Sequence, residues 1–210
     1  MIGQRGKALY GVDEIAASYD AQAAESYRAK EDNPDFFELY GRAVGAELAK
    51  LKPSSVLDAG CGDGVTLHWA VRELPFECTV NGIDASSKRL KIARKTIGAR
   101  VFFVQGQLGS ILFRDERFDV VFTSHAMEPN GGDEVTILTE LARVARRYVV
   151  LFEPDYNAAS LEGRARMRRL NYVANIRGAI KEVGLTVEKD EPFSVVGNAL
   201  NPTGLWVLSK

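Results

Sequence analysis

The segment VLDAGCGDGVT, residues 56–66, constrains the fold of this chain more than any other. Two apolar residues lead into an aspartate, Asp58, and glycines then stand at positions 60, 62 and 64. Glycine lets the backbone adopt positive φ and approach a ligand closely, as a strand-to-helix turn around a ligand requires. Because open parallel sheets bind ligands at the carboxyl ends of their strands, the segment predicts a nucleoside cofactor in an α/β fold.

Two classes of cofactor use a glycine-rich turn, and the spacing separates them. A dinucleotide site reads G-x-G-x-x-G, or closes with alanine, whereas the closing position here is Val65, so a nicotinamide dehydrogenase is disfavoured. An acidic residue before G-x-G-x-G resembles instead the first motif of the class I S-adenosylmethionine-dependent methyltransferases. The resemblance implies S-adenosylmethionine as the cofactor. It also implies a Rossmann-like three-layer sandwich, with a seven-stranded, mostly parallel sheet that ends in an antiparallel C-terminal hairpin strand.

The resemblance also implies which residues contact the cofactor. Asp84 ends the next predicted strand, where one carboxylate can accept hydrogen bonds from both ribose hydroxyls, although a helix-capping or surface role is the alternative. Gln107 stands where related enzymes usually have an aspartate for the adenine amino group, and its carbonyl oxygen can accept the same bond without the charge. The other expected contacts in the core are Asp58, Gly60, Cys61, Gly62, Ala85, Leu108 and Ser124.

Three polar side chains are the catalytic candidates. His125 follows the predicted fourth strand, and a histidine with an ordinary pKa of about 6.5 can remove a proton from an acceptor. Glu128 and Glu153 each precede a proline, which keeps the chain extended as it leaves a strand, so both are expected at the same sheet edge as His125. His125 could equally order the loop. The glutamates could order the loop or orient the acceptor; no spaced ligand motif supports a metal, and none is expected.

The 210 residues are expected to form a single domain. Hydrophobic residues make up 46% and charged residues 26%, close to the averages for globular proteins. Helical patterns at 64–74, 86–97, 132–146 and 160–183 alternate with apolar strands, which indicates a parallel sheet covered on both faces. Two final strands, at 185–189 and 204–209, are expected to pair antiparallel.

The first 34 residues differ from the core, which is expected at 35–210. The segment IAASYD within them resembles the lid of several small methyltransferases. Tyr19 in that segment is expected to close over the methionine end of the cofactor. A helical cap whose tyrosines pack against the sheet is the alternative.

These features predict methyl transfer to an oxygen or nitrogen of a small molecule, such as a sugar or an acidic metabolite. The net charge of −1 provides no overall attraction to nucleic acid. Arginines cluster at 143–147 and 164–177, where most are expected on solvated helix faces and an acidic acceptor is the alternative. A nucleic-acid or protein methyltransferase and a non-catalytic S-adenosylmethionine-binding protein also remain open.

The cysteines and the hydropathy of the sequence indicate the cellular compartment in which the protein is expected. The two cysteines lack C-x-x-C spacing, and no signal-peptide pattern is present, which predicts reduced thiols and a cytoplasmic protein. No apolar run approaches the roughly 18 residues that span a bilayer, so no membrane partner is expected. Both a monomer and a homodimer are compatible with the sequence.

Overall fold

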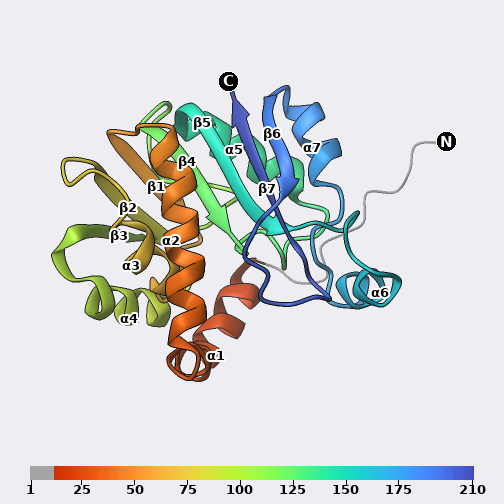
Figure 1. The fold of residues 1–210 in the computed structure, drawn as a ribbon, viewed down its shortest axis with the longest axis horizontal. Helices are drawn as coiled ribbons and strands as arrows, with labels where there is room; N and C mark the ends of the chain where they lie inside the picture. The colour runs from red at the N-terminus through yellow and green to blue at the C-terminus, as the bar shows by residue number, and fades with distance from the viewer. Residues whose placement is uncertain (1–11) are drawn as a thin grey trace.

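A seven-stranded sheet organises the computed structural model, which describes residues 12–210 (Figure 1). The strand order is β3-β2-β1-β4-β5-β7-β6. The strands are β1 (Ser55–Ala59), β2 (Thr79–Asp84), β3 (Val101–Gln105), β4 (Phe118–Ser124), β5 (Ala145–Pro154), β6 (Thr186–Pro192) and β7 (Thr203–Ser209). β1 to β5 pair in parallel, whereas β7 pairs antiparallel with both β5 and β6. The predicted sheet is therefore confirmed.

Helices cover both faces of this sheet. They are α1 (Val12–Glu31), α2 (Pro34–Lys50), α3 (Val65–Ala70), α4 (Ser87–Ile97), α5 (Glu134–Val144), α6 (Leu161–Arg169) and α7 (Ile176–Val183). α2, α3 and α4 share one core cluster with the sheet, and α5 and α7 share the other. Between the two helical layers, β1 and β4 are buried at nearly every position, as parallel strands covered on both faces must be. No helix of residues 12–210 is long and apolar enough to cross a membrane.

One predicted helix, at 160–183, is wrong: α6 and α7 are separate helices. The chain leaves α6 through Asn171, whose φ of 53° is in the left-handed region. It then bonds to the segment that follows β4: Val173 N donates to Glu128 O at 3.0 Å, and Gly131 N donates to Asn171 O at 3.0 Å. These tertiary hydrogen bonds override the local helical pattern.

The helix predicted at 64–74 is also shorter than expected. It ends at Ala70, and residues 71–73 form a turn in which Glu73 N donates to Ala70 O at 3.1 Å. The other helical patterns correspond to α4 and α5, with ends within two residues of the prediction.

α1 is the described part of the predicted lid, whose residues 1–11 lie outside the described residues. It lies with α6 along the lower edge of the sheet in Figure 1. Asp20 accepts hydrogen bonds from Ser86 Oγ at 2.5 Å and from Lys88 N at 3.1 Å, at the start of α4. At the other end of α1, Lys30 Nζ lies 2.7 Å from both carboxylate oxygens of Asp63. The helix is thereby tied to two of the loops that follow the strands.

Candidate active site

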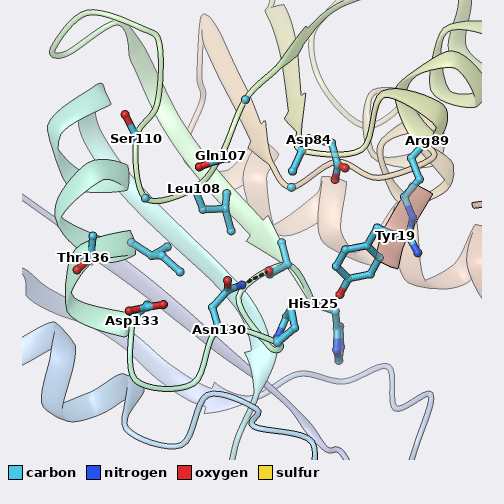
Figure 2. A pocket seen from close by; sticks show the side chains of 17 residues that line it. Tyr19, Asp84, Arg89, Gln107, Leu108, Ser110, His125, Asn130, Asp133 and Thr136 are labelled. Atoms are coloured by element: carbon cyan, nitrogen blue, oxygen red, sulfur yellow. Dashed lines mark hydrogen bonds between the residues drawn. The ribbon is translucent and has the colours of Figure 1, made fainter. Parts of the chain in front are cut away.

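Two cavities adjoin at the carboxyl ends of the parallel strands. The first has a volume of about 300 Å³ and lies beside Asp84 and Leu108 (Figure 2). The second has a volume of about 440 Å³ and is walled by α1, α2, α6, the segment after β4 and the loop before β7. Both are lined by Tyr19, Gly60, Arg89 and His125. A ligand that passes from one cavity to the other therefore passes these four residues.

The glycine loop needs its glycines for steric reasons. Gly60 has a φ of 87°, and a Cβ atom there would lie 2.2 Å from Cβ of Ala126. Gly62 has a φ of 56°, and its amide donates to Asp84 Oδ2 at 2.9 Å. Larger residues would strain this backbone or displace the segment after β4, so the loop is built to keep the backbone open to a ligand.

Two carboxylates stand beside this loop, Asp84 half-buried and Asp58 buried. Asp84 also accepts from Ser86 N at 2.8 Å, and burial raises its pKa although both backbone bonds oppose the rise. Asp58 is 2% exposed, and its Oδ1 has no hydrogen-bond partner within residues 12–210. Burial raises the pKa of Asp58 well above its ordinary value, and the charge of Asp84 adds to the rise. Hydroxyl and ammonium donors of a bound nucleoside cofactor would offset this desolvation.

All ten residues predicted to contact the cofactor line one cavity or the other. Ala85, Gln107 and Leu108 line the first, together with Asp84. Ser124 lines the second and shares a 3.1 Å hydrogen bond with the hydroxyl of Tyr40. The remaining ones are Tyr19, Asp58, Gly60, Cys61 and Gly62, all in the lining of the second cavity. Their positions agree with the predicted roles, and the contacts themselves stay a prediction.

Cys61 and Tyr19 fill two of these positions in different ways. The thiol of Cys61 is buried and free, and burial raises its pKa. Tyr19 projects from α1 between Asp84 and Arg89 on one side and His125 on the other (Figure 2). The guanidinium carbon of Arg89 lies 4.3 Å from the centre of its ring. Burial and then the charge of Glu128 raise the pKa of Tyr19, so its hydroxyl stays protonated.

His125 is the centre of a hydrogen-bonded group in the second cavity. Its φ of 51° is in the left-handed region, which is uncommon for a residue with a side chain. Nδ1 lies 3.0 Å from Glu128 Oε2, and Nε2 lies 2.8 Å from Thr203 Oγ1. Asn201 Nδ2 donates to the same Glu128 oxygen at 3.0 Å. Because a carboxylate only accepts, Nδ1 carries the proton and neutral Nε2 accepts from Thr203.

Two carboxylates set the proton affinity of His125. Burial alone would lower its pKa, but the hydrogen bond and charge of Glu128, with the charge of Glu153, raise it above the ordinary value. Glu128 therefore both orients the ring and stabilises its protonated form.

Glu153 differs from its predicted position facing the acceptor. Its side chain is fully buried and is absent from the described lining of both cavities. Oε1 accepts from Ala126 N at 2.9 Å and from Met127 N at 3.1 Å, while Oε2 finds no partner in the described part of the chain. Burial raises the pKa of Glu153 to about 7. The proline after Glu153 correctly predicted the end of the strand. The carboxyl group of Glu153 nevertheless lies inside the protein, where it accepts hydrogen bonds from the backbone amides that follow β4.

No metal cluster accompanies these residues. Within residues 12–210, the structure contains no group of three or more His, Cys, Asp or Glu side chains arranged to hold a metal ion.

Sequence reasoning missed several residues that line the second cavity. They are Arg166, Tyr172, Asn198, Asn201 and Thr203. They come from α6, from the connection after it and from the loop before β7, and no local motif marks them. Arg166 belongs to the arginine cluster at 164–177, for which a solvated helix face was expected and an acidic acceptor was the alternative.

Comparison with known proteins agrees with this geometry. Residues 56–147 match the family described as a methyltransferase domain. The matched stretch begins in β1 and ends in β5, so it includes the glycine loop, Asp84, His125 and Glu128. α1, α6 and the loop before β7, which complete the second cavity, lie outside it.

Individual relatives match part of the chain. It is 31% identical over 100 residues to demethylmenaquinone methyltransferase of Thermotoga maritima, covering 48% of this chain and 42% of that protein. It is 28% identical over 140 residues to probable tocopherol O-methyltransferase of Oryza sativa, covering 65% of this chain and 36% of that protein. The chain thus spans less than half the length of these two relatives.

Solved structures share the whole fold. Magnesium protoporphyrin IX methyltransferase from Synechocystis, solved with bound S-adenosylhomocysteine, superposes with a TM-score of 0.71 at 16% identity, over 95% of this chain and 100% of that one. An S-adenosylmethionine-dependent methyltransferase from Aquifex aeolicus superposes with a TM-score of 0.67 at 18% identity, over 87% and 97%. At these identities the likeness shows the fold.

The Glu128–His125 contact predicts that the pKa values of the two histidines, His125 and His68, differ. His125 should titrate above 6.5, whereas burial and the charge of Arg72 lower the pKa of His68 below it. Glu128→Gln should lower the pKa of His125 by roughly one unit or more, because it removes a charged hydrogen bond. NMR titration of the imidazole carbons measures both, with His68 as the internal control. An unchanged His125 pKa in the variant would contradict the assignment.

Burial of Glu153 predicts a pH-dependent loss of stability. Its pKa rises from 4.5 to about 7 on folding, so its contribution is complete below pH 4.5 and is lost as the pH rises through about 7. The loss is on the order of 3 kcal/mol. Urea denaturation of wild type and Glu153→Gln between pH 5.5 and 8 should show it: the variant gains stability relative to wild type as the pH rises.

Glu140→Gln is the matched control. The hydrogen bond from Arg143 lowers the pKa of Glu140, so its contribution is lost only as the pH falls below its ordinary range. The free-energy difference between this variant and wild type should stay constant from pH 5.5 to 8. If the free energy of unfolding of Glu153→Gln instead changed with pH in parallel with that of wild type, Glu153 would not be a buried carboxyl with a raised pKa.

Proposed function

Because residues 56–147 belong to a methyltransferase-domain family and the fold is that of the class I S-adenosylmethionine-dependent methyltransferases, we propose that the protein methylates a small molecule on oxygen or nitrogen. S-adenosylmethionine is the cofactor, and its sulfonium supplies an electrophilic methyl group. The observation that carries the proposal is the meeting of two cavities at Gly60, Tyr19 and His125. One cavity has the groups that suit an adenosine, and the other has aligned polar groups that suit an acceptor.

The residues of the first cavity and those beside the glycine loop have the hydrogen-bonding capacity that the cofactor needs. Each oxygen of Asp84 accepts one backbone amide and keeps a lone pair for a ribose hydroxyl. Asp58 Oδ1, unpartnered among residues 12–210, suits the ammonium of the methionine moiety. Gln107 offers its carbonyl oxygen to the adenine amino group. Tyr19 covers the junction, where its aromatic ring tolerates a neighbouring sulfonium cation.

On the acceptor side, His125 is proposed as the base. Glu128 holds the proton of Nδ1, so Nε2 is the basic atom, and the acceptor hydroxyl or amine takes the place of the Thr203 hydroxyl there. The bound cofactor would supply the methyl group, with its carbon–sulfur bond breaking to leave S-adenosylhomocysteine, and Nε2 would receive the proton that the acceptor loses. Glu153 acts as a positioning residue, since it holds the amides of Ala126 and Met127 beside His125.

Alignment of the two reactants is expected to contribute more than the base. Holding two reactants in line lowers the barrier by about 7–11 kcal/mol. A general base usually accelerates a reaction by roughly 10²–10⁴-fold, which corresponds to about 3–5 kcal/mol. Replacement of His125 is therefore expected to slow the reaction without abolishing it.

The relatives favour a small-molecule acceptor. The two named above are methyltransferases of demethylmenaquinone and, by their description, tocopherol, both small molecules. The net charge of −1 also lacks the basic excess that attracts nucleic acid. A small-molecule acceptor is therefore favoured over a nucleic acid or a protein.

Asp84 provides the sharpest test of the cofactor site. Asp84→Ala removes the acceptor of two ribose hydroxyls, and charged hydrogen bonds contribute about 1.5–3 kcal/mol each, so affinity for S-adenosylmethionine should fall at least about 100-fold. Isothermal titration calorimetry measures the affinity, and circular dichroism checks the fold. Asp32→Ala, an exposed change at the end of the lid helix, should bind as wild type does. Equal affinity in Asp84→Ala would remove Asp84 from the site.

Transfer itself is tested with the cofactor labelled in its methyl group. Incubation of the protein with this cofactor and a small-molecule extract should place label on a metabolite, and boiled protein is the control. Transfer to added RNA or protein, with the small molecules unlabelled, would favour a macromolecular acceptor. Cofactor binding without any labelled product would indicate a binding protein that does not turn over.

A further inference from the structure

Four residues that line the second cavity carry a buried polar atom without a partner in the described part of the chain. Asp58 and Arg89 lie beside the glycine loop, whereas Arg166 and Asn201 come from α6 and the loop before β7. Nη1 of Arg166 and Oδ1 of Asn201 are both inaccessible and have no hydrogen-bond partner among residues 12–210. Both residues line the cavity, and Asn201 is only 7% exposed. Buried donors and acceptors are normally satisfied because leaving one unpaired costs free energy. A donor and an acceptor left unpaired in one cavity therefore indicate a ligand that supplies both complements.

Local contacts fix Asn201 in this orientation. Its Nδ2 donates to Glu128 Oε2 at 3.0 Å, which leaves Oδ1 as the unpaired end of the amide. Its backbone amide donates to Asn198 O at 2.9 Å, and Leu200 N donates to Asn198 Oδ1 at 2.9 Å. The loop before β7 is thus a closed turn, and the free amide oxygen is a consequence of its geometry.

α6 is held directly against this turn. A Cβ atom added to Gly163 would lie 2.7 Å from the backbone oxygen of Leu200. The loop backbone therefore occupies the space where a side chain at position 163 would be. Arg166 lies one turn further along α6, and its guanidinium carbon is 5.5 Å from the centre of the Tyr172 ring. This close approach sets Arg166 and Asn201 on the wall of one cavity.

The neighbouring arginines are engaged elsewhere. Arg164 donates to two backbone carbonyl oxygens, Arg168 to a tyrosine hydroxyl, and Arg177 to two aspartates. Among the other cationic side chains of the cavity, Lys30 is paired with Asp63, and Arg89 lies beside Tyr19 and Gly62, on the side of the glycine loop. Arg166 lines the cavity and hydrogen-bonds with Tyr172, while its Nη1 keeps unused hydrogen-bonding capacity. The planar fork of a guanidinium matches the oxygens of a carboxylate or phosphate.

We propose that the acceptor is a small acid, bound through its carboxylate or phosphate by Arg166 and through a hydroxyl or amine that donates to Asn201. This inference rests on the proposed methyl transfer and adds the chemical class of the acceptor. Phe36, Phe37 and Tyr172 line the same cavity and provide aromatic surface for the carbon skeleton. Arg166 and Asn201 are thus specificity-determining residues, and His125 stands at the reacting end.

The test begins with the chemistry of the acceptor. A metabolite extract is separated on an anion exchanger at pH 8, and the retained and unretained fractions are each incubated with the protein and methyl-labelled S-adenosylmethionine. Label is expected in the retained fraction. Treatment of that fraction with alkaline phosphatase before incubation distinguishes the two anions. The phosphatase removes the phosphate of a monoester, so labelling of such an acceptor should be lost, whereas a carboxylate is unchanged and should still be labelled.

The variants then identify the residue that reads the acid. Arg166→Met should lower kcat/KM for the retained acceptor by roughly 10-fold to 100-fold, as expected for loss of a charged hydrogen bond, with unchanged affinity for the cofactor. Arg166→Lys keeps the charge and should recover part of the loss. Arg169→Met, at an exposed position on the same helix, is the matched control and should behave as wild type.

The failures are distinguishable. Label that appears with the unretained fraction overturns the acid while leaving methyl transfer intact. An unchanged kcat/KM in folded Arg166→Met and Arg166→Lys overturns the role of Arg166. If the protein binds the cofactor and labels neither fraction, methyl transfer fails, and the acid acceptor fails with it.

Discussion

The two hydrogen bonds that Asp84 accepts from Gly62 N and Ser86 N are the constraint on which the rest of the site depends. They join the end of β2 to the glycine loop after β1 and to the start of α4. Ser86 in turn donates to Asp20 of the lid helix, so a single carboxylate links three segments around the first cavity. Since burial raises the pKa of Asp84, the arrangement favours a ligand that brings further donors to it.

The proposed acceptor side of the site depends on a different carboxylate. Glu153, buried in β5, holds the amides of Ala126 and Met127 and so determines how the chain leaves β4. His125 then takes a left-handed backbone conformation between β4 and these amides, and its ring reaches Thr203 of β7. β7 runs antiparallel beside β5, so its first residue lies at the same sheet edge as the end of β5. The antiparallel strand therefore supplies a polar group at an edge otherwise formed by parallel strands.

This difference explains what the sequence could predict. The glycine loop, Asp84 and the strand order follow from local patterns, because parallel strands bring consecutive strand ends to one edge. Arg166, Asn201 and Thr203 come from a helix and a loop that local patterns do not relate to His125. The continuous helix expected over 160–183 failed for a similar reason, since the bonds of Val173 and Gly131 to distant segments outweigh local helical propensity. Glu153 was located correctly at a strand end, but its burial depends on backbone amides that only the tertiary fold brings to it.

The glycine loop and α6 consequently differ in how tightly sequence changes are constrained. A side chain at Gly60 would collide with Ala126 at 2.2 Å, and one at Gly62 would force a left-handed residue to carry Cβ, so the cofactor loop tolerates little change. Arg166 lies on a helix that meets the loop before β7 at Gly163. Substitution there alters the chemistry of the second cavity while Asp84 and the glycine loop keep their hydrogen bonds. The proposed acceptor contact at Arg166 thus rests on different structural supports from the proposed cofactor contacts of Asp84.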